Sequence, residues 1–338
     1  MSLKFISCAS YYGTGSSAIT DFVSEFNDVY SFTKEEFRFV QDPDGISDLE
    51  YNLVENFNRH NSGHALKRFK RLVDFQCGNL FGKRYEKFFL GNWKKYSYEY
   101  IKNLTDFTYK GWWQYDLYDK GSFYYFKKRI LNKLLHLTIW RNQPERCLNS
   151  MKNEITYCSH PTEDKFLKCT KQYLSSLFSS VCNGSNIVMV DQIVPPTNLK
   201  RYLRYFDDIQ VVIVDRDPRD VYVLQKFVWN VGIVPTDVET FCKWFKYTRS
   251  HRITEKNDSA KVKLLQFEDL IYKYDEISKE LADWLGLKSS NHTMPRKYFI
   301  PEKSINNTQT WKRYPCDMAE IAYIEQELKQ YLYDFPKL

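Results

Sequence analysis

Residues 211–223 read VVIVDRDPRDVYV, an apolar and β-branched run that ends in an acid and is followed by Arg216. Such a run predicts a buried strand of a parallel sheet. Asp217 and Pro218 then form a turn, and Asp220 opens a helix. A strand that delivers an arginine at its carboxyl end places a cation where open α/β sheets bind phosphate. The stretch therefore predicts both a fold class and an anionic ligand.

Strands and helices alternate along most of the 338 residues. We predict strands at 3–9, 36–42, 184–192, 211–217 and 262–267. Helices are predicted at 18–26, from Ser47 or Asp48 onward, and at 199–206, 221–227, 238–249, 276–287 and 319–332. This alternation predicts an α/β fold of three layers, α/β/α, with a central parallel sheet.

The segment 81–169 interrupts the alternation, because it is dense in Tyr, Phe, Trp and Lys and has poor strand signals. We interpret it as a mostly helical, aromatic-rich insertion or lid. The length alone allows about two domains, and one domain, 1–338, that carries this insertion is equally compatible. We predict the single domain.

Composition favours a small anionic ligand over nucleic acid. The formal charge of +7 is modest for this length and is concentrated locally, as in ALKRFKRLV at 65–73. The eight cysteines are scattered, without CxxC pairs or zinc spacing, and no apolar stretch has the length of a signal peptide or a membrane span. His60 and His64 lie four apart but lack an HExxH context, so we expect no metal. These features predict a soluble cytoplasmic protein with reduced thiols.

A glycine loop, GTGSS at 13–17, lies between the first predicted strand and the first predicted helix. Backbone N–H groups and the positive end of a helix dipole face a common anion at such a turn. Thr14, Ser16 and Ser17 add hydroxyl donors. The loop is not a Walker A motif, because Gly15 is followed by Ser16 where that motif has lysine. Phosphoryl transfer from a nucleoside triphosphate would lack its central cation.

Two further stretches complete a set of motifs that resembles the sulfotransferase family. They are DRDPRD around Arg216 and LLQFEDLIYKYDEISKELADWLGL at 264–287, and a late loop, KSINNTQTWKR, follows at 303–313. The resemblance spans both ends of the chain but not its middle. It implies a P-loop-like sulfotransferase fold and transfer of a sulfuryl group from 3'-phosphoadenosine 5'-phosphosulfate (PAPS) to an acceptor hydroxyl, with adenosine 3',5'-bisphosphate as product.

The resemblance also implies residue roles. The glycine loop would cradle the 5'-phosphosulfate, Arg216 would bind the 3'-phosphate, and the late loop would close over the nucleotide. Donors at two strand ends suit a cofactor that is anionic at both of its ends. The cofactor-binding residues implied are Gly13, Thr14, Gly15, Ser16, Ser17, Arg216, Lys303, Ser304, Asn307 and Trp311.

Two departures from the family pattern remove cations. Gly13 stands where the family usually has Lys or Arg, and Gln192 stands where it has a lysine after the middle strand. We expect Lys303, Lys67 or Arg68 to supply the cation that stabilises the bridging oxygen.

Two more departures concern the nucleotide. Leu224 replaces a serine that normally shares the 3'-phosphate, so Tyr222, Gln225 or backbone is the expected substitute. Ala18 replaces an aromatic that often stacks on adenine, which leaves adenine recognition unassigned.

Transfer requires a general base for the acceptor hydroxyl. Glu36 is the first candidate, because EFRFVQD resembles the glutamate-bearing strand end of glycan-modifying members, although an exposed structural role is an equal alternative. Asp191, which closes the strand at 184–192, is the second candidate, with capping of the following turn as its alternative. For the acceptor we expect ring stacking on Trp112, Trp113 and Tyr115 and a contact with His64, and one of His60 and His64 is a further possible base.

We therefore predict a PAPS-dependent sulfotransferase without a metal, whose acceptor is a hydroxyl on a saccharide or glycolipid. A steroid or other lipid alcohol is the alternative acceptor, and contact with a lipid-linked acceptor is compatible with either. A kinase-like phosphotransferase and a non-catalytic binder of a nucleotide or polyanion are the competing classes.

Overall fold

The computed structural model describes residues 3–78, 84–148, 151, 153–250 and 260–336. The chain forms two compact units. Residues 1–41 with 178–338 make up one, called here the sheet unit, and residues 42–177 make up the other, called the helical unit.

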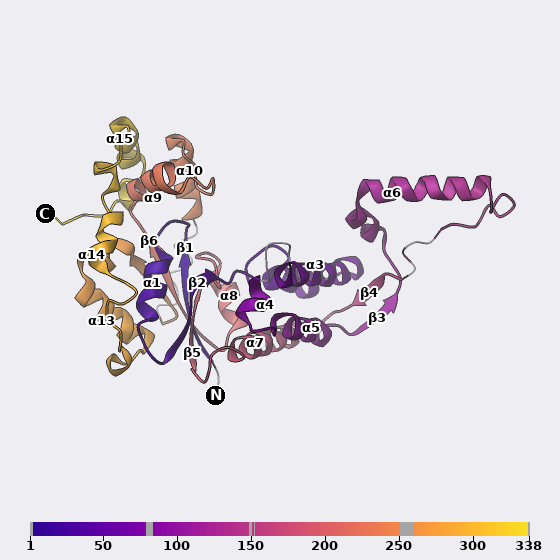
Figure 1. Cartoon of the computed structure of the whole chain (residues 1–338), viewed down its shortest axis with the longest axis horizontal. Helices are drawn as coiled ribbons and strands as arrows, with labels where there is room; N and C mark the ends of the chain where they lie inside the picture. Colours follow the sequence, from indigo (N-terminus) through magenta and orange to yellow (C-terminus); the bar gives the residue numbers. More distant parts are fainter. Residues whose placement is uncertain (1–2, 79–83, 149–150, 152, 251–259, 337–338) are drawn as a thin grey trace. The chain divides into compact units, whose positions relative to one another are not determined.

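A five-stranded parallel sheet forms the centre of the sheet unit (Figure 1). Its strand order is β2-β5-β1-β6-β7, and each neighbouring pair is parallel. The strands are β1 (Lys4–Ser10), β2 (Val29–Glu36), β5 (Ile187–Asp191), β6 (Asp208–Asp215) and β7 (Val262–Gln266). Because all five run the same way, their carboxyl ends meet at one edge of the sheet.

Helices cover both faces of this sheet. Figure 1 shows α1 (Ser16–Val23) and α13 (Tyr274–Leu285) on one side and α8 (Leu199–Tyr202) on the other. Ile6 of β1 belongs to the apolar cluster that contains the buried residues of α1 and α13. The neighbouring Phe5 packs instead on Phe178 and Phe206, with ring centroids 5.3 and 5.0 Å away. The predicted three-layer α/β/α architecture is confirmed.

The described part of the sheet unit contains five further α-helices. They are α9 (Pro218–Leu224), α10 (Val238–Thr248), α12 (Phe267–Tyr272), α14 (Pro301–Ser304) and α15 (Met318–Glu327). A second buried cluster joins α9, α10 and α15. Helix α9 begins earlier than expected: Pro218 is its first residue and the Asp217 carboxylate accepts from the N–H of Arg219 at 2.9 Å. Proline fits this position because the first N–H of a helix has no partner within it.

The strand predicted at 36–42 is wrong, since β2 ends at Glu36. Phe37 and Phe39 are buried and Arg38 between them is only partly buried, an alternation typical of a strand. Here it arises from packing beyond the end of the strand, where the ring of Phe37 contacts Phe178 at a centroid distance of 5.2 Å.

The helical unit contains α2 (Ile46–Glu50), α3 (Arg59–Cys77), α4 (Arg84–Phe88), α5 (Trp93–Leu104), α6 (Gln114–Leu137), most of α7 (Glu163–Ser179), and an antiparallel hairpin of β3 (Phe107–Lys110) and β4 (Ile155–Cys158). Tyr100 of α5 stacks on Tyr173 of α7 at 4.7 Å. The hairpin was not expected, because all of β3 is exposed and shows no alternation of apolar and polar faces. The described part of 81–169 lies in this unit, and its action as a lid stays a prediction. Of the helices in the described part of the chain, none is long and apolar enough to cross a bilayer.

Candidate active site

The glycine loop follows β1 and opens α1. Gly13 has φ +68 and Gly15 has φ +100, values that side chains rarely adopt. A Cβ atom would lie 2.5 Å from the Trp229 ring at Gly13 and 2.5 Å from the Phe267 ring at Gly15. Both backbone conformation and space therefore require glycine at these two positions. The Thr14 hydroxyl donates to the carbonyl of Val214 at 2.7 Å, which ties the loop to β6.

Arg216 follows directly after β6 and extends toward the same loop. Its guanidinium donates to the carbonyl oxygen of Gly13 at 3.2 Å and to that of Asn307 in the late loop. It also lies 4.7 Å from the centroid of the Phe267 ring. Burial lowers the pKa of Arg216, while the nearby carboxyls, Asp220 first, oppose that shift. The cation predicted from the sequence is thus buried beside the glycine loop.

A cavity of about 410 Å³ joins these groups. Of the residues predicted to bind cofactor, seven line it: Gly13, Gly15, Ser16, Ser17, Arg216, Ser304 and Asn307. Four aromatic residues that the sequence did not assign complete much of the wall: Trp229, Phe267, Tyr298 and Phe299. The volume falls in the range of cavities that take a nucleotide-sized ligand.

Three residues implied by the resemblance are not among the described residues that line this cavity. Thr14 is buried under the loop. Lys303 is exposed on α14. Trp311 is buried in the second cluster, where its ring lies 4.0 Å from the guanidinium of Arg219.

The late loop is held in place by Asp220 of α9. The Asp220 carboxylate accepts from the N–H of Gln309 at 3.0 Å, the N–H of Thr310 at 2.7 Å and the hydroxyl of Thr310 at 2.6 Å. Burial raises the pKa of Asp220 to about 6, although Arg216 and Thr310 favour its charged form. The charged carboxylate therefore positions the loop that offers Ser304 and Asn307 to the cavity.

Glu36 and Asp191, the two candidate bases, lie side by side at the carboxyl edge of the sheet. The β2–β5 pairing runs from Ser31 opposite Met189 to Glu36 opposite Asp191, with a register shift between them. The Ser16 hydroxyl donates to Asp191 at 3.2 Å, which links this pair to the glycine loop. Burial first, and then the charge of Glu36, raises the pKa of Asp191 to about 7. A carboxyl with such a pKa can take up a proton near neutral pH.

A second cavity, of about 260 Å³, lies beside the carboxyl ends of β1 and β5. Its lining residues include Ser10, Tyr11, Tyr12, Arg38, Gln192 and Tyr247. Arg38 pairs with Glu36 at 3.7 Å and donates to the hydroxyl of Tyr12 at 3.0 Å. The sequence assigned no role to Arg38, which is the cation that the structure places next to the acid pair.

Gln192, where the resemblance expects a lysine, has a structural contact. Its side-chain amide donates to the Ser10 hydroxyl at 2.6 Å. The expected replacements for the missing cation, Lys67 and Arg68, lie in the helical unit, where they pair with Asp116 at 2.6 Å and Asp44 at 2.7 Å.

The two side chains expected to substitute for the serine at Leu224 do not line the cavity. The Tyr222 hydroxyl donates to the carbonyl of Thr236 at 3.0 Å. Gln225 is buried, and neither residue is among the described residues that line the 410 Å³ cavity.

The residues expected to contact the acceptor all lie in the helical unit. Tyr115 meets His64 edge to face at 4.3 Å, and the Trp113 ring lies 3.9 Å from the guanidinium of Arg59. Trp112 lies 5.3 Å from the ammonium of Lys128. Their contact with an acceptor stays a prediction.

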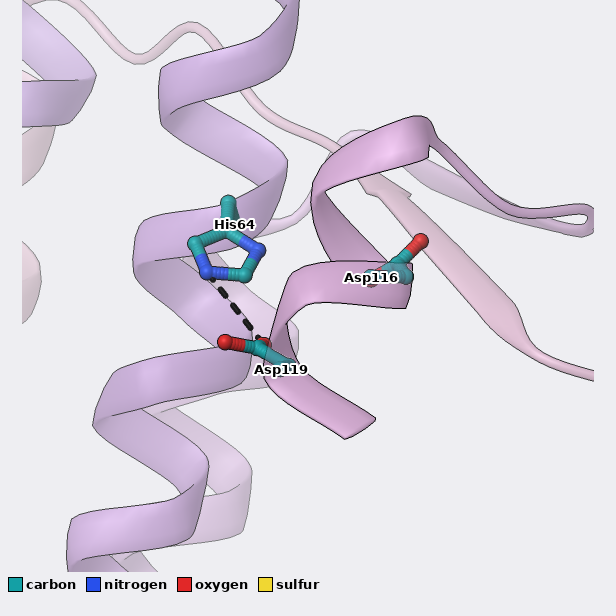
Figure 2. Close-up of side chains that lie close together, drawn as sticks. All are labelled: His64, Asp116 and Asp119. Carbon is teal, nitrogen blue, oxygen red and sulfur yellow. Dashed lines mark ion pairs between the residues drawn. The ribbon is translucent and has the colours of Figure 1, made fainter. Parts of the chain in front are cut away.

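His64 also belongs to an ionic cluster with Asp116 and Asp119, shown in Figure 2. One ligand atom from each residue falls within 4.8 Å of the others, and His64 Nε2 lies 3.4 Å from Asp119. Each carboxylate, however, already pairs with a cation: Asp116 with Lys67 at 2.6 Å and Asp119 with Arg71 at 2.9 Å. A divalent cation would have to displace both, so we interpret the cluster as the ion pairs that attach the first turns of α6 to α3.

Comparison with known proteins gives likeness of fold only. No protein-family model matches the chain, and no curated protein is similar in sequence. Among solved structures, the sulfotransferase domain of the Synechococcus PCC 7002 olefin synthase has a TM-score of 0.43 and 11% identity, with 99% of this chain and 95% of that chain covered. The sulfotransferase domain of the curacin biosynthetic pathway has a TM-score of 0.42 and 11% identity, with 99% of both chains covered.

A retinol dehydratase solved with androsterone and the inactive cofactor PAP has a TM-score of 0.38 and 15% identity, with 99% of this chain and 82% of that chain covered. All three TM-scores lie below 0.5.

The sequence missed Trp229, Phe299 and Arg38. Trp229 follows α9 as part of a helical turn, and in the sequence it reads as an ordinary apolar position. Arg38 lies inside the stretch that was taken for a strand. The available signal in the sequence was the glutamate two residues before Arg38, because this spacing brings a cation close to a candidate base.

Proposed function

We propose that this protein is a PAPS-dependent sulfotransferase that acts on a hydroxyl of a saccharide or glycolipid. The observation that carries the proposal is one cavity that holds both a glycine loop at a helix N-terminus and a buried arginine at the end of the adjacent strand. Two separate anion sites on one nucleotide-sized cavity suit a nucleotide with phosphate groups at its 5' and 3' positions.

In this proposal, the N–H groups of the loop and the hydroxyls of Ser16 and Ser17 hold the 5'-phosphosulfate. Arg216 exchanges the carbonyls of Gly13 and Asn307 for oxygens of the 3'-phosphate. The rings of Trp229 and Phe299 offer apolar faces to adenine, the role that Ala18 does not fill. Bound PAPS supplies the activated sulfuryl group.

The acceptor hydroxyl would enter from the 260 Å³ cavity. Neither Asp191 nor Glu36 is among the described residues that line this cavity, but Gln192, which follows Asp191, and Arg38, which pairs with Glu36, do line it. In the proposal, Asp191 or Glu36 takes the hydroxyl proton, as the acceptor oxygen bonds to sulfur and the bond from sulfur to the phosphate oxygen breaks. The raised pKa of Asp191, about 7, supports it as the base. Arg38 supplies a positive charge beside this pair and is our candidate for the cation missing at Gly13 and Gln192.

A saccharide is favoured because tyrosines and hydrogen-bonding side chains both line the second cavity. Sugars present an apolar face for stacking and hydroxyls for polar contacts. The eight cysteines are all free thiols, which supports the expected location in the cytoplasm.

The test is transfer of labelled sulfate from PAPS to a panel of saccharides, glycolipids and steroid alcohols. We expect transfer to a glycan, with Asp191→Asn abolishing transfer while binding of adenosine 3',5'-bisphosphate is retained. Loss of transfer in Glu36→Gln but not in Asp191→Asn would identify Glu36 as the base. Sulfation of a steroid alone would favour the alternative acceptor. Tight binding without transfer would indicate a non-catalytic binder, and preference for ATP would indicate a kinase-like enzyme.

A further inference from the structure

Helix α6 of the helical unit is divided at Gly121, whose φ of 81 and ψ of 164 are not helical. Before this point, Asp116 and Asp119 attach the helix to Lys67 and Arg71 of α3. After it, residues 122–137 form a segment whose large apolar side chains remain exposed. The exposed fractions of Phe123, Phe126, Leu134 and Leu137 are 78%, 60%, 53% and 66%.

Five of the seven exposed large apolar side chains of the segment share one face, and the other two, Tyr125 and Leu131, lie outside it. Phe123, Phe126, Ile130, Leu134 and Leu137 follow one another at intervals of three or four residues, the spacing that brings side chains to one side of an α-helix. The chain that follows α6 contacts the opposite side: the N–H of Leu148 donates to the Asn132 side chain at 2.7 Å, and Trp140 meets His136 edge to face at 5.8 Å. The apolar face is thus the side that this returning chain leaves uncovered. Figure 1 shows the chain returning along α6 toward β4.

The charged side chains of this segment are all positive, and Lys127 and Lys133 lie at the two edges of this face, whereas Lys128 lies on the opposite side, 5.3 Å from the Trp112 ring. Lys127, Lys128, Arg129 and Lys133 belong to the segment, and the sequence from 120 to 144 contains no Asp or Glu. A second copy of the chain would bring the same positive charges to the contact and would be repelled. Anionic lipid headgroups complement these charges, and the acyl region beneath them accepts the apolar side chains.

We propose that residues 122–137 of α6 lie in the interface of an anionic lipid bilayer, with the apolar face turned toward the acyl chains. The segment is too charged to span a bilayer, in agreement with the search for membrane-crossing helices among the described residues. Its sixteen residues would cover about 24 Å along the surface. The proposal does not depend on sulfuryl transfer, because it concerns a surface of the helical unit alone.

The test is sedimentation of the full chain with vesicles, without nucleotide or acceptor. We expect binding to phosphatidylcholine vesicles that contain about one third phosphatidylglycerol and weak binding to pure phosphatidylcholine, with release at high salt. The combined variant Lys127→Gln, Arg129→Gln and Lys133→Gln should weaken binding by about one hundredfold, since each cation near an anionic surface contributes about fivefold. The matched control replaces three exposed lysines of α5 and α7, Lys95, Lys102 and Lys168, by Gln and should bind nearly as the wild type.

A second variant tests the apolar face. Phe126→Ser, Ile130→Ser and Leu134→Ser together should abolish binding, while Phe75→Ser, Leu90→Ser and Phe107→Ser, exposed elsewhere in the helical unit, should not. Thermal unfolding checks that each variant remains folded. The proposal is overturned if the wild type does not bind anionic vesicles, or if the α6 variants bind as tightly as their controls. It is also overturned if the wild type is a dimer that the apolar variant converts to a monomer.

Discussion

Arg216→Gln removes the buried guanidinium that contacts both the glycine loop and the late loop. Without ligand, two of its N–H groups donate to the carbonyls of Gly13 and Asn307, and the side chain lines the 410 Å³ cavity. A charge-assisted hydrogen bond contributes about 1.5–3 kcal/mol. Loss of the phosphate contact should therefore weaken the binding of adenosine 3',5'-bisphosphate by roughly 10- to 150-fold.

Isothermal titration calorimetry with two ligands separates this role from a general loss of structure. The wild type should prefer adenosine 3',5'-bisphosphate to adenosine 5'-monophosphate, which lacks the 3'-phosphate, and Arg216→Gln should erase most of that preference. Arg219→Gln is the matched control. Arg219 lies three residues further on, pairs with Asp217 at 2.7 Å and Glu325 at 2.8 Å, and is not among the described residues that line the cavity.

The reasoning fails if Arg216→Gln weakens both ligands equally, because a 3'-phosphate contact affects only the ligand that carries this group. It also fails if Arg219→Gln reduces the preference as much as Arg216→Gln does. Arg216→Lys should give an intermediate result, since it keeps the charge but loses the forked donors.

Asp191→Asn should change the pH dependence of stability. The pKa of Asp191 in the folded protein, about 7, lies above the ordinary value of 3.8. The protonated carboxyl therefore stabilises the fold fully below about pH 4, and this stabilisation is lost as the pH rises through 7. The variant should therefore show a smaller fall in the free energy of unfolding across that range, by at most about 4 kcal/mol in urea titrations. Gly15→Ala should lower the free energy of unfolding by at least about 1 kcal/mol more than Gly184→Ala does, since both glycines have positive φ but only the Cβ added at Gly15 would meet a ring. Equal losses of stability would contradict the steric argument. Arg249→Met removes the guanidinium that pairs with the buried Asp215 at 2.6 Å and should lower the free energy of unfolding by about 3–5 kcal/mol. Adding Asp215→Asn should recover part of the lost stability.

The strand that presents Arg216 could be predicted because its signal is local. An uninterrupted apolar run followed by a charged turn has few alternatives in an α/β protein, and β6 indeed contains residues 211–215 of that run. The glycine loop was equally local, since two glycines between a strand and a helix indicate unusual backbone angles.

The walls of the cavities could not be predicted in the same way. Trp229 and Phe267 approach Gly13 and Gly15 from distant parts of the chain, and their contact depends on how helices pack on the sheet. The alternation around Arg38 indicated a strand, yet it arose from packing after the strand had ended. The position of Glu36 opposite Asp191 likewise depends on pairing between strands about 150 residues apart, which sequence periodicity does not encode.

The register shift in β2 decides which side chain accompanies Asp191. Continued without a shift from Ser31 opposite Met189, a regular strand would bring residue 33 to Asp191, and Glu36 would fall beyond the sheet. Three additional residues of chain between these pairings move the glutamate into line. The acid pair is therefore a property of chain length as much as of residue type, and an insertion or deletion at 32–34 would separate the two carboxyls while leaving both in the sequence.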